Sequence, residues 1–213
     1  HHTFSFDTYY NPRRMNFGAL RVLNDDRVEA GKGFGTHPHK NMEIISIPLK
    51  GKLKHGDSQK NSRSITPGDI QTMSAGTGIY HSEMNGSDTE PVEFLQIWVM
   101  PEKLNTPPAY QDYDIRPLLR KNELTLIVSP DGDAPAKMLQ QAWFSIGEIE
   151  AGKKIGYHMH QSHAGVYIFV IEGEVKVDDT VLSRRDGMGV YDTHSFELET
   201  LKDSHILLME VPM

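Results

Sequence analysis

The chain has 213 residues, of which 38% are hydrophobic and 24% charged, and its formal net charge is −7. This length suits one large or two modest domains with a real core, and the composition argues against disorder. Negative charge without a basic run argues against nucleic acid as a partner, and no apolar run reaches the roughly 20 residues that span a bilayer, so we expect a cytoplasmic protein without membrane contact.

The chain contains no cysteine, and its first thirty residues are predicted to form two short strands. Without cysteine there are no disulfides, no thiolate metal ligands and no cysteine nucleophile. Residues 3–6 alternate polar and aromatic side chains, and residues 18–23 form a second apolar run. Phe4 and Phe6 are expected to be core residues.

Two histidine-containing pairs are the main chemical signal of the sequence. His37 and His39 are one residue apart, and His81 and Glu83 repeat this spacing about forty residues later. Side chains at i and i+2 leave the same face of a strand, so two adjacent strands would present three imidazoles and one carboxylate to a single ion. These nitrogen and oxygen donors suit Fe, Mn, Co, Ni, Cu or Zn. The sequence therefore predicts a metal site.

The residues around these pairs are predicted to be strands and turns. Glycines at 31, 33 and 35 precede the first pair and allow close backbone approach. Residues 43–49 follow as a predicted strand. Glu43 and the other odd-numbered residues are an even number of positions from His37 and His39, so their side chains would point to the same inner face. We expect Glu43 to support the site rather than ligate, and His55 to be structural or to orient a ligand. Phe34, Met73 and Trp98 are candidate pocket walls as well as core residues.

The composition changes after residue 100. Residues 101–117 carry four prolines, which is typical of a linker, and we place the domain boundary near residue 105. Residues 115–124 are predicted to contain one short helix, with Asp114 as its N-terminal cap and Pro117 in its first turn.

The second half repeats the opening of the first. Gly152 precedes the pair His158 and His160 by the same spacing that separates Gly31 from His37, and an apolar run over residues 164–170 follows. Such self-similarity predicts two stacked copies of one double-sheet β-barrel. His158, His160 and His194 are candidates for a second metal site. Ala164 stands where a motif carboxylate would be, and no His-x-Glu pair follows, so we expect this half to lack metal.

The chain resembles the pirin family of bicupins over nearly its whole length. Three segments of the first half match motifs of the family: Phe34–His39, Pro67–Asp69 and Met73–Glu83. The second half matches the family less closely. The resemblance implies two jelly-roll barrels with few short helices, with residues 1–105 as a metal-binding N-terminal cupin and residues 106–213 as a C-terminal cupin. It also implies that His37, His39, His81 and Glu83 are the ligands and that Glu43 is not.

The resemblance further implies two different functions. Some pirins cleave the flavonol quercetin with dioxygen, which predicts an enzyme that uses Fe(II), a small aromatic substrate and O2, with Glu83 as the base that accepts the hydroxyl proton. Others bind transcription factors, which predicts a non-enzymatic redox sensor acting through a partner protein. Another small-molecule cupin enzyme is a third alternative. Zn, Ni, Cu, Mn and Co suit the same ligands as iron does. We expect a monomer, because a two-barrel chain has its own hydrophobic core.

Overall fold

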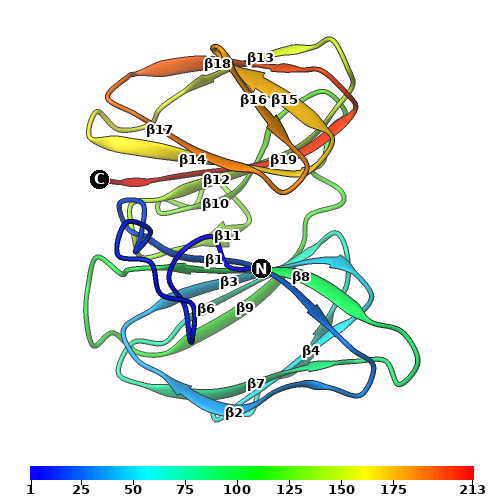
Figure 1. The fold of residues 1–213 in the computed structure, drawn as a ribbon. Helices are drawn as coiled ribbons and strands as arrows, with labels where there is room; N and C mark the ends of the chain where they lie inside the picture. Colours follow the sequence, from blue (N-terminus) through cyan, green and yellow to red (C-terminus); the bar gives the residue numbers. More distant parts are fainter. The chain divides into compact units, whose positions relative to one another are not determined.

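A computed structural model describes all 213 residues, which form strands and turns but no helix (Figure 1). The all-β prediction is confirmed, whereas the helix predicted over residues 115–124 is wrong. Ile115 is buried, and its backbone N–H donates a hydrogen bond to the carbonyl of Gly68, which holds this segment against the preceding sheet. No element of the chain is a helix with the length and apolarity that a bilayer span requires.

The chain divides into two compact units, each built from two mainly antiparallel sheets. Unit 1 comprises residues 1–116 and 138–140, and unit 2 comprises residues 117–137 and 141–213. Two sheets of alternating strands with short connections are the layout of a jelly-roll barrel. Each half of the chain therefore forms its own barrel, as the internal repeat predicts.

Unit 1 has a five-stranded sheet in the order β1-β8-β3-β6-β9 and a four-stranded sheet in the order β2-β7-β4-β5. Its strands are β1 (Leu20–Val28), β2 (Gly33–His39), β3 (Glu43–Lys50), β4 (Leu53–Asp57), β5 (Ser62–Ile65), β6 (Asp69–Ser74), β7 (Ile79–Asn85), β8 (Val92–Val99) and β9 (Ala109–Asp114). β9 follows the boundary that we predicted near residue 105. It pairs with β6, so unit 1 continues to Arg116.

Unit 2 has a six-stranded sheet in the order β11-β10-β12-β19-β14-β17, in which only the short β10–β11 pair is parallel, and a four-stranded sheet in the order β13-β18-β15-β16. Its strands are β10 (Thr125–Ser129), β11 (Ala136–Lys137), β12 (Trp143–Ile149), β13 (Lys154–His158), β14 (Ala164–Glu172), β15 (Glu174–Val177), β16 (Thr180–Ser183), β17 (Gly187–Tyr191), β18 (Ser195–Thr200) and β19 (Ser204–Pro212).

The N-terminal segment differs from the prediction. Residues 3–6 do not form a strand: the segment makes only isolated bridges, between Phe6 and Tyr9 and between His2 and Asn24. Asp7 has a positive φ of 48°, which turns the chain at the point where a strand would have to continue. Phe4 is buried, as expected of a core residue, whereas Phe6 is only half-buried.

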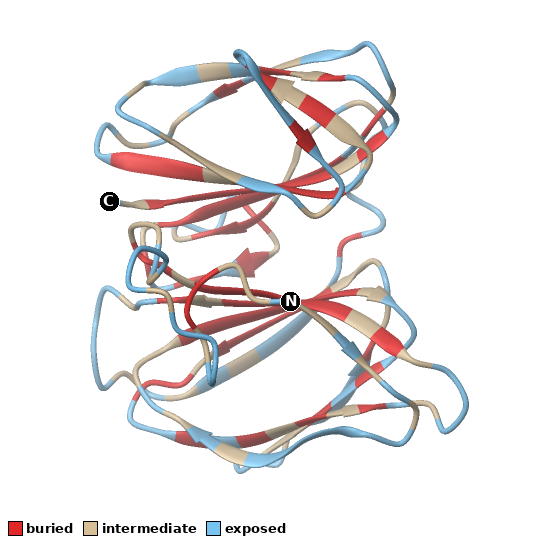
Figure 2. Cartoon of the chain, in the orientation of Figure 1, coloured by how far each residue is buried: buried red, intermediate tan, exposed pale blue.

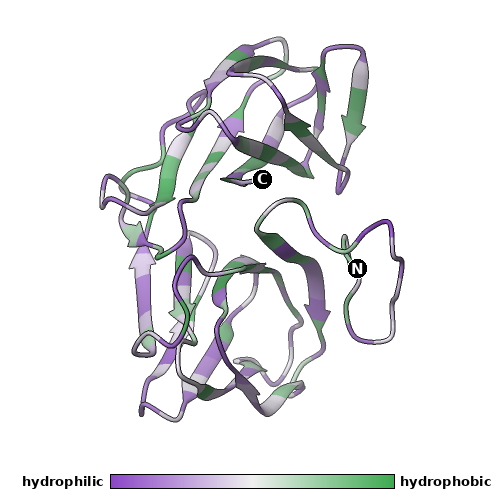
Figure 3. Ribbon diagram, turned by 90° about the vertical axis from the view of Figure 1, so that its left-hand side faces the viewer, coloured by the Kyte–Doolittle hydropathy of each residue, from purple (hydrophilic) through white to green (hydrophobic).

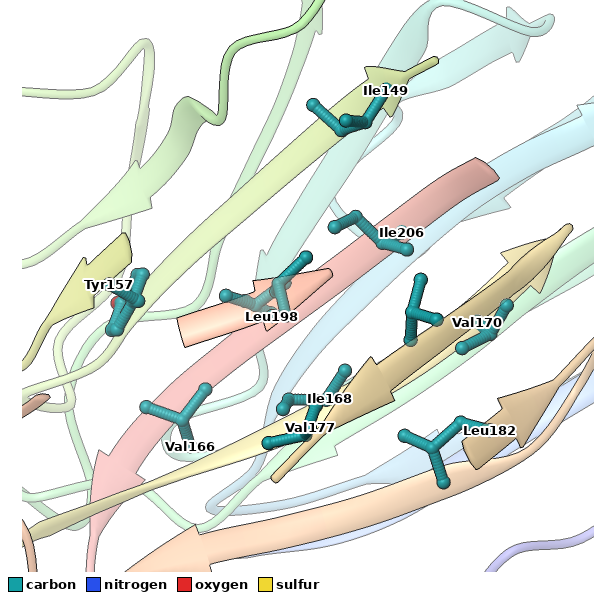
Figure 4. Close-up of a cluster of buried hydrophobic side chains, with 11 residues drawn as sticks. Ile149, Tyr157, Val166, Ile168, Val170, Val177, Leu182, Leu198 and Ile206 are labelled. Carbon is teal, nitrogen blue, oxygen red and sulfur yellow. The ribbon is translucent and has the colours of Figure 1, made fainter. Parts of the chain in front are cut away.

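The most deeply buried residues of each unit lie on strands, most connections are exposed, and some strands such as β2 and β9 are themselves largely exposed (Figure 2). Apolar and polar segments both occur along the strands, as expected of sheets with one face turned to a barrel interior (Figure 3). In unit 2 the interior is a large aliphatic cluster that includes Val166, Ile168, Leu198, Ile206 and Leu208 (Figure 4). Unit 1 has two smaller apolar clusters, one around Ile44 and Met73 and one around Leu53 and Phe94.

Candidate metal centre

Two neighbouring strands of unit 1, β2 and β7, bring three histidines together. His37 and His39 come from β2 and His81 from β7, where it pairs directly with His37. Their ring centroids lie 4.5–4.9 Å apart. One ring nitrogen from each of the three histidines lies within 4.8 Å of the other two, which is the spacing of side chains that can share one cation.

The backbone of β2 is adapted to this close pairing. Gly33 approaches β7 so closely that a Cβ there would lie 2.5 Å from the carbonyl oxygen of Glu83 and the Cα of Met84, so only glycine fits. The ladder is irregular between Phe34 and His37, which re-aims the side chains that follow. The predicted role of the glycine run is therefore confirmed at Gly33.

The protonation of two of the three rings, those of His39 and His81, favours a cation. Burial first, and then the neighbouring His39 and His37, lower the pKa of His81 to about 3. Burial likewise lowers the pKa of His39 to about 4, with His37 adding to the effect. Both rings are thus neutral at physiological pH, and neutral imidazole is the form that ligates metals. The Nδ1 atom of His37 lies 2.7 Å from the carbonyl oxygen of Gly35 and donates to it, which leaves Nε2 with its lone pair.

His81 provides the strongest indication that the group is incomplete without an ion. Its side chain is 1% exposed, and neither ring nitrogen has a hydrogen-bond partner. An unsatisfied buried polar group costs about 1–3 kcal/mol, and such groups are rare in folded proteins. A divalent cation bound to a ring nitrogen would satisfy it, so the donor set fits the metal that the sequence predicts.

Glu83 lies two residues after His81 on β7 and is buried, but its carboxylate is outside the three-histidine group. It accepts hydrogen bonds from the Ser46 hydroxyl, at 2.9 Å, and from the Gln96 amide. Burial raises its pKa to about 7, although both hydrogen bonds act to lower it. A nearby cation would favour the charged form of this carboxyl.

The prediction that Glu43 and the odd-numbered residues of β3 continue the inner face is wrong. Between His39 and Glu43 the chain leaves the strand, and Asn41 has a positive φ of 51°, which breaks the alternation. Ser46 therefore faces Glu83, and Glu43 instead accepts a hydrogen bond from the Leu139 backbone N–H at 3.0 Å. Ser46 is a site residue that was missed, because the alternation was assumed to continue unbroken from His39 into β3.

Aromatic side chains also lie near the histidines. The Trp98 ring lies edge-on to His39 at 4.8 Å, and its buried indole N–H has no acceptor. Phe34 pairs with Glu83 across the ladder and is 43% exposed. Met73, the third candidate wall, is buried in an apolar cluster against which Trp98 packs.

The histidines of the second half do not form a comparable group. His158, His160 and His194 are exposed, and His158 pairs with Ser195 where His37 pairs with His81. The His160 ring stacks on Trp143 at 4.7 Å, and its Nδ1 lies 2.7 Å from the buried carboxylate of Glu210. This carboxylate was not anticipated from the sequence.

Comparison with known proteins relates both halves of the chain to one group. Residues 1–99 match the family model described as Pirin, and residues 126–211 match the one described as Quercetinase C-terminal cupin domain. A protein of Escherichia coli (strain K12) named quercetin 2,3-dioxygenase is 39% identical over 216 aligned positions, which cover 99% of this chain and 90% of that protein.

Two solved structures are similar over the same range. YhhW from Escherichia coli has a TM-score of 0.94 at 39% identity and covers 99% of this chain and 89% of its own. Bacterial pirin YhhW in complex with nickel(II), from the same organism, has a TM-score of 0.93 at 38% identity, with 99% and 90% coverage. The likeness thus extends over both barrels, including the strands that carry the three histidines.

Proposed function

The chain belongs to the pirin family, and we propose that it is a metal-dependent dioxygenase that cleaves a flavonol such as quercetin with dioxygen. The observation that carries this proposal is the group of three histidines on β2 and β7. The name of the 39% identical Escherichia coli relative, quercetin 2,3-dioxygenase, supports the choice of substrate and reaction.

We propose that one Fe(II) ion binds in unit 1, with His37, His39, His81 and Glu83 as ligands. The unsatisfied nitrogens of His81 and the neutral state of two of the rings support the histidine part of this set. The nickel(II) complex of the Escherichia coli pirin supports a divalent transition metal. Histidine and carboxylate donors with open positions are typical of non-haem iron oxygenases, which is our reason for choosing iron.

A bound divalent ion would act as a Lewis acid and lower the pKa of a chelated flavonol hydroxyl. Glu83 would accept the proton from this hydroxyl, because a buried carboxylate beside the ion has the reach and the basicity of a general base. Ser46 and Gln96 hold its carboxylate by hydrogen bonds. Phe34 and Trp98 offer ring surfaces against which a flat aromatic substrate can pack.

The test combines metal analysis with an oxygen-uptake assay on one preparation. The iron-loaded protein is incubated with quercetin under air while the flavonol absorbance and oxygen are followed, and we expect both to fall together. Turnover with bound iron supports the proposal. Full iron occupancy without turnover would refute it and would favour the redox-sensing role that some pirins have.

The role of Glu83 is tested by Glu83→Gln, with Glu43→Gln as the matched control. Both residues are buried glutamates of unit 1, but Glu43 hydrogen-bonds to Leu139 and does not face the histidines. We expect turnover to fall about 100-fold or more for Glu83→Gln, the usual range for loss of a general base, and to change little for Glu43→Gln. Unchanged turnover and metal content in Glu83→Gln would remove the base from the mechanism.

A further inference from the structure

We propose that His55 is a positioning residue of the metal centre, fixing the orientation of the His81 ring by direct packing. This inference rests on the proposed metal site. His55 lies on β4, next to β7 in the four-stranded sheet, and its ring centroid is 5.4 Å from that of His81 with the ring planes at 52°.

His81 needs such a contact because it lacks the usual one. A metal-ligating histidine normally donates its second ring N–H to a carboxylate, carbonyl or water, which fixes the orientation of the ring. Neither nitrogen of His81 has a hydrogen-bond partner in the protein. Its ring contacts are with His37, His39 and His55, and the first two would be ligands of the same ion. His55 is therefore the one ring against His81 that can orient it independently of the metal.

His55 is itself held in one position and one tautomer. Its side chain is completely buried, and its Nε2 donates to the Asp57 carboxylate at 2.9 Å. Its Nδ1 accepts from the Gln71 amide at 3.3 Å. Both ring nitrogens are thus engaged, which excludes His55 as a fourth imidazole ligand and leaves it as a fixed surface for His81.

Tyr110 completes this support from β9. Its ring stacks on His55 with centroids 4.4 Å apart and planes at 23°. Its hydroxyl donates to Gln71 Oε1 at 3.3 Å, so the amide nitrogen of Gln71 must point to His55. The other side chains of β9 are exposed, apart from the half-buried Tyr113. A strand that buries so little is consistent with a role in carrying Tyr110 to His55.

Strand register couples this support to the ligands. Across β4 and β7, Asp57 pairs with His81 and His55 pairs with Glu83. The Asp57 carboxylate is in turn held by Asn61, through its backbone N–H at 3.0 Å and its side-chain amide. The orientation of His81 is thus set by a hydrogen-bonded network whose members are not ligands.

The experiment loads the protein with Co(II) alone, whose visible absorption bands report the geometry of the ligands. Affinity is measured by competition with a chelator, and thermal stability is recorded for each variant. We expect His55→Ala to lower Co(II) affinity about 10–100-fold, the usual effect of losing a group that supports a ligand, and to shift the bands. Tyr110→Phe keeps the stacked ring and should shift the bands slightly. If His55→Ala does not fold, His55→Gln removes the ring and keeps a polar group beside Asp57.

The control is Tyr157→Phe, which removes a buried hydroxyl hydrogen bond in unit 2, far along the chain from His37, His39 and His81. It should lower stability without changing the Co(II) bands. If the His55 variants lose stability but keep wild-type affinity and bands, His55 is merely structural and the inference is wrong. If wild type binds no Co(II), or His81→Ala binds it equally well, the proposed metal site itself fails. These two failures are therefore distinguishable.

Discussion

The two barrels share a strand plan and differ in what fills them. In unit 1 the interior includes polar side chains such as His55, Gln71, Glu83 and Gln96, all buried and mostly hydrogen-bonded to one another. In unit 2 the corresponding interior is a continuous cluster of valine, leucine and isoleucine side chains together with Tyr157 (Figure 4). The difference shows that the fold requires a filled interior but does not require a polar one.

The two barrels also differ in the surroundings of the second histidine of each His-x-His pair. In unit 1, Trp98 packs edge-on against His39. In unit 2, the carboxylate of Glu210 accepts hydrogen bonds from the ring and backbone of His160, the Gln161 backbone and the Tyr157 hydroxyl. His160 is thus tied to a protein carboxylate, whereas His39 remains free to bind an ion. This difference predicts that His160 makes no contribution to metal binding.

The largest expected effect separates the two barrels by metal content. His81→Ala should lower affinity for a divalent ion more than 100-fold, because loss of a ligand exceeds the 10–100-fold cost of losing a supporting residue. His160→Ala should leave one ion per chain. Elemental analysis after dialysis, together with calorimetric titration, measures both. Loss of half the bound metal in His160→Ala would show that each barrel holds a metal site, and the difference between the two barrels in metal binding would be wrong.

The next effect concerns the stability of unit 2. In Glu210→Gln one acceptor oxygen becomes an NH2 group, although four donors converge on the native carboxylate. Each buried donor left without an acceptor costs about 1–3 kcal/mol, so we expect a loss of about 3 kcal/mol in the free energy of unfolding. Denaturant titration measures it, and metal affinity should not change. A variant as stable as wild type would show that the network does not stabilise this barrel.

The same substitution in unit 1 should have the opposite sign in metal-free protein. The folded-state pKa of Glu83 is about 7, above its ordinary 4.5, so between these values the folded state binds more protons than the unfolded state. Stability is then lost as the pH rises through this window. Glu83→Gln removes the ionisation and should be more stable than wild type by about 3 kcal/mol at pH 8, and equal at pH 4. Thermal unfolding of metal-free samples at both pH values tests this, and equal stability at pH 8 would contradict it.

The residues that we propose as metal ligands could be selected from the sequence because the period of a strand is local. Side chains at i and i+2 share a face wherever the strand is regular, so the two pairs on β2 and β7 could be assigned before the fold was known. The pairing of β2 with β7 then placed His37 opposite His81. The repeat of the His-x-His spacing likewise predicted two barrels, because each copy must bury its own interior.

The supporting residues were not accessible, because they depend on irregular or distant structure. Ser46 faces Glu83 only because the chain turns at Asn41, where φ is positive. Tyr110 lies in a segment whose prolines indicate a linker, and the composition gave no sign that β9 joins the sheet. Glu210 lies within an apolar strand fifty residues after His160, and no local pattern connects them.

The smallest expected effect comes from one change made in both barrels. Tyr157→Phe removes one of four hydrogen bonds to Glu210 and should lower the free energy of unfolding by about 1 kcal/mol, with no change at the metal. Tyr110→Phe removes a longer bond to Gln71 and should cost about 0.5 kcal/mol, yet alter the Co(II) spectrum. Denaturant titration and absorption spectra of the two variants measure these effects. If Tyr157→Phe changed the spectrum as much as Tyr110→Phe, support of the metal site would not be confined to unit 1, because a hydroxyl of the apolar barrel would affect it equally.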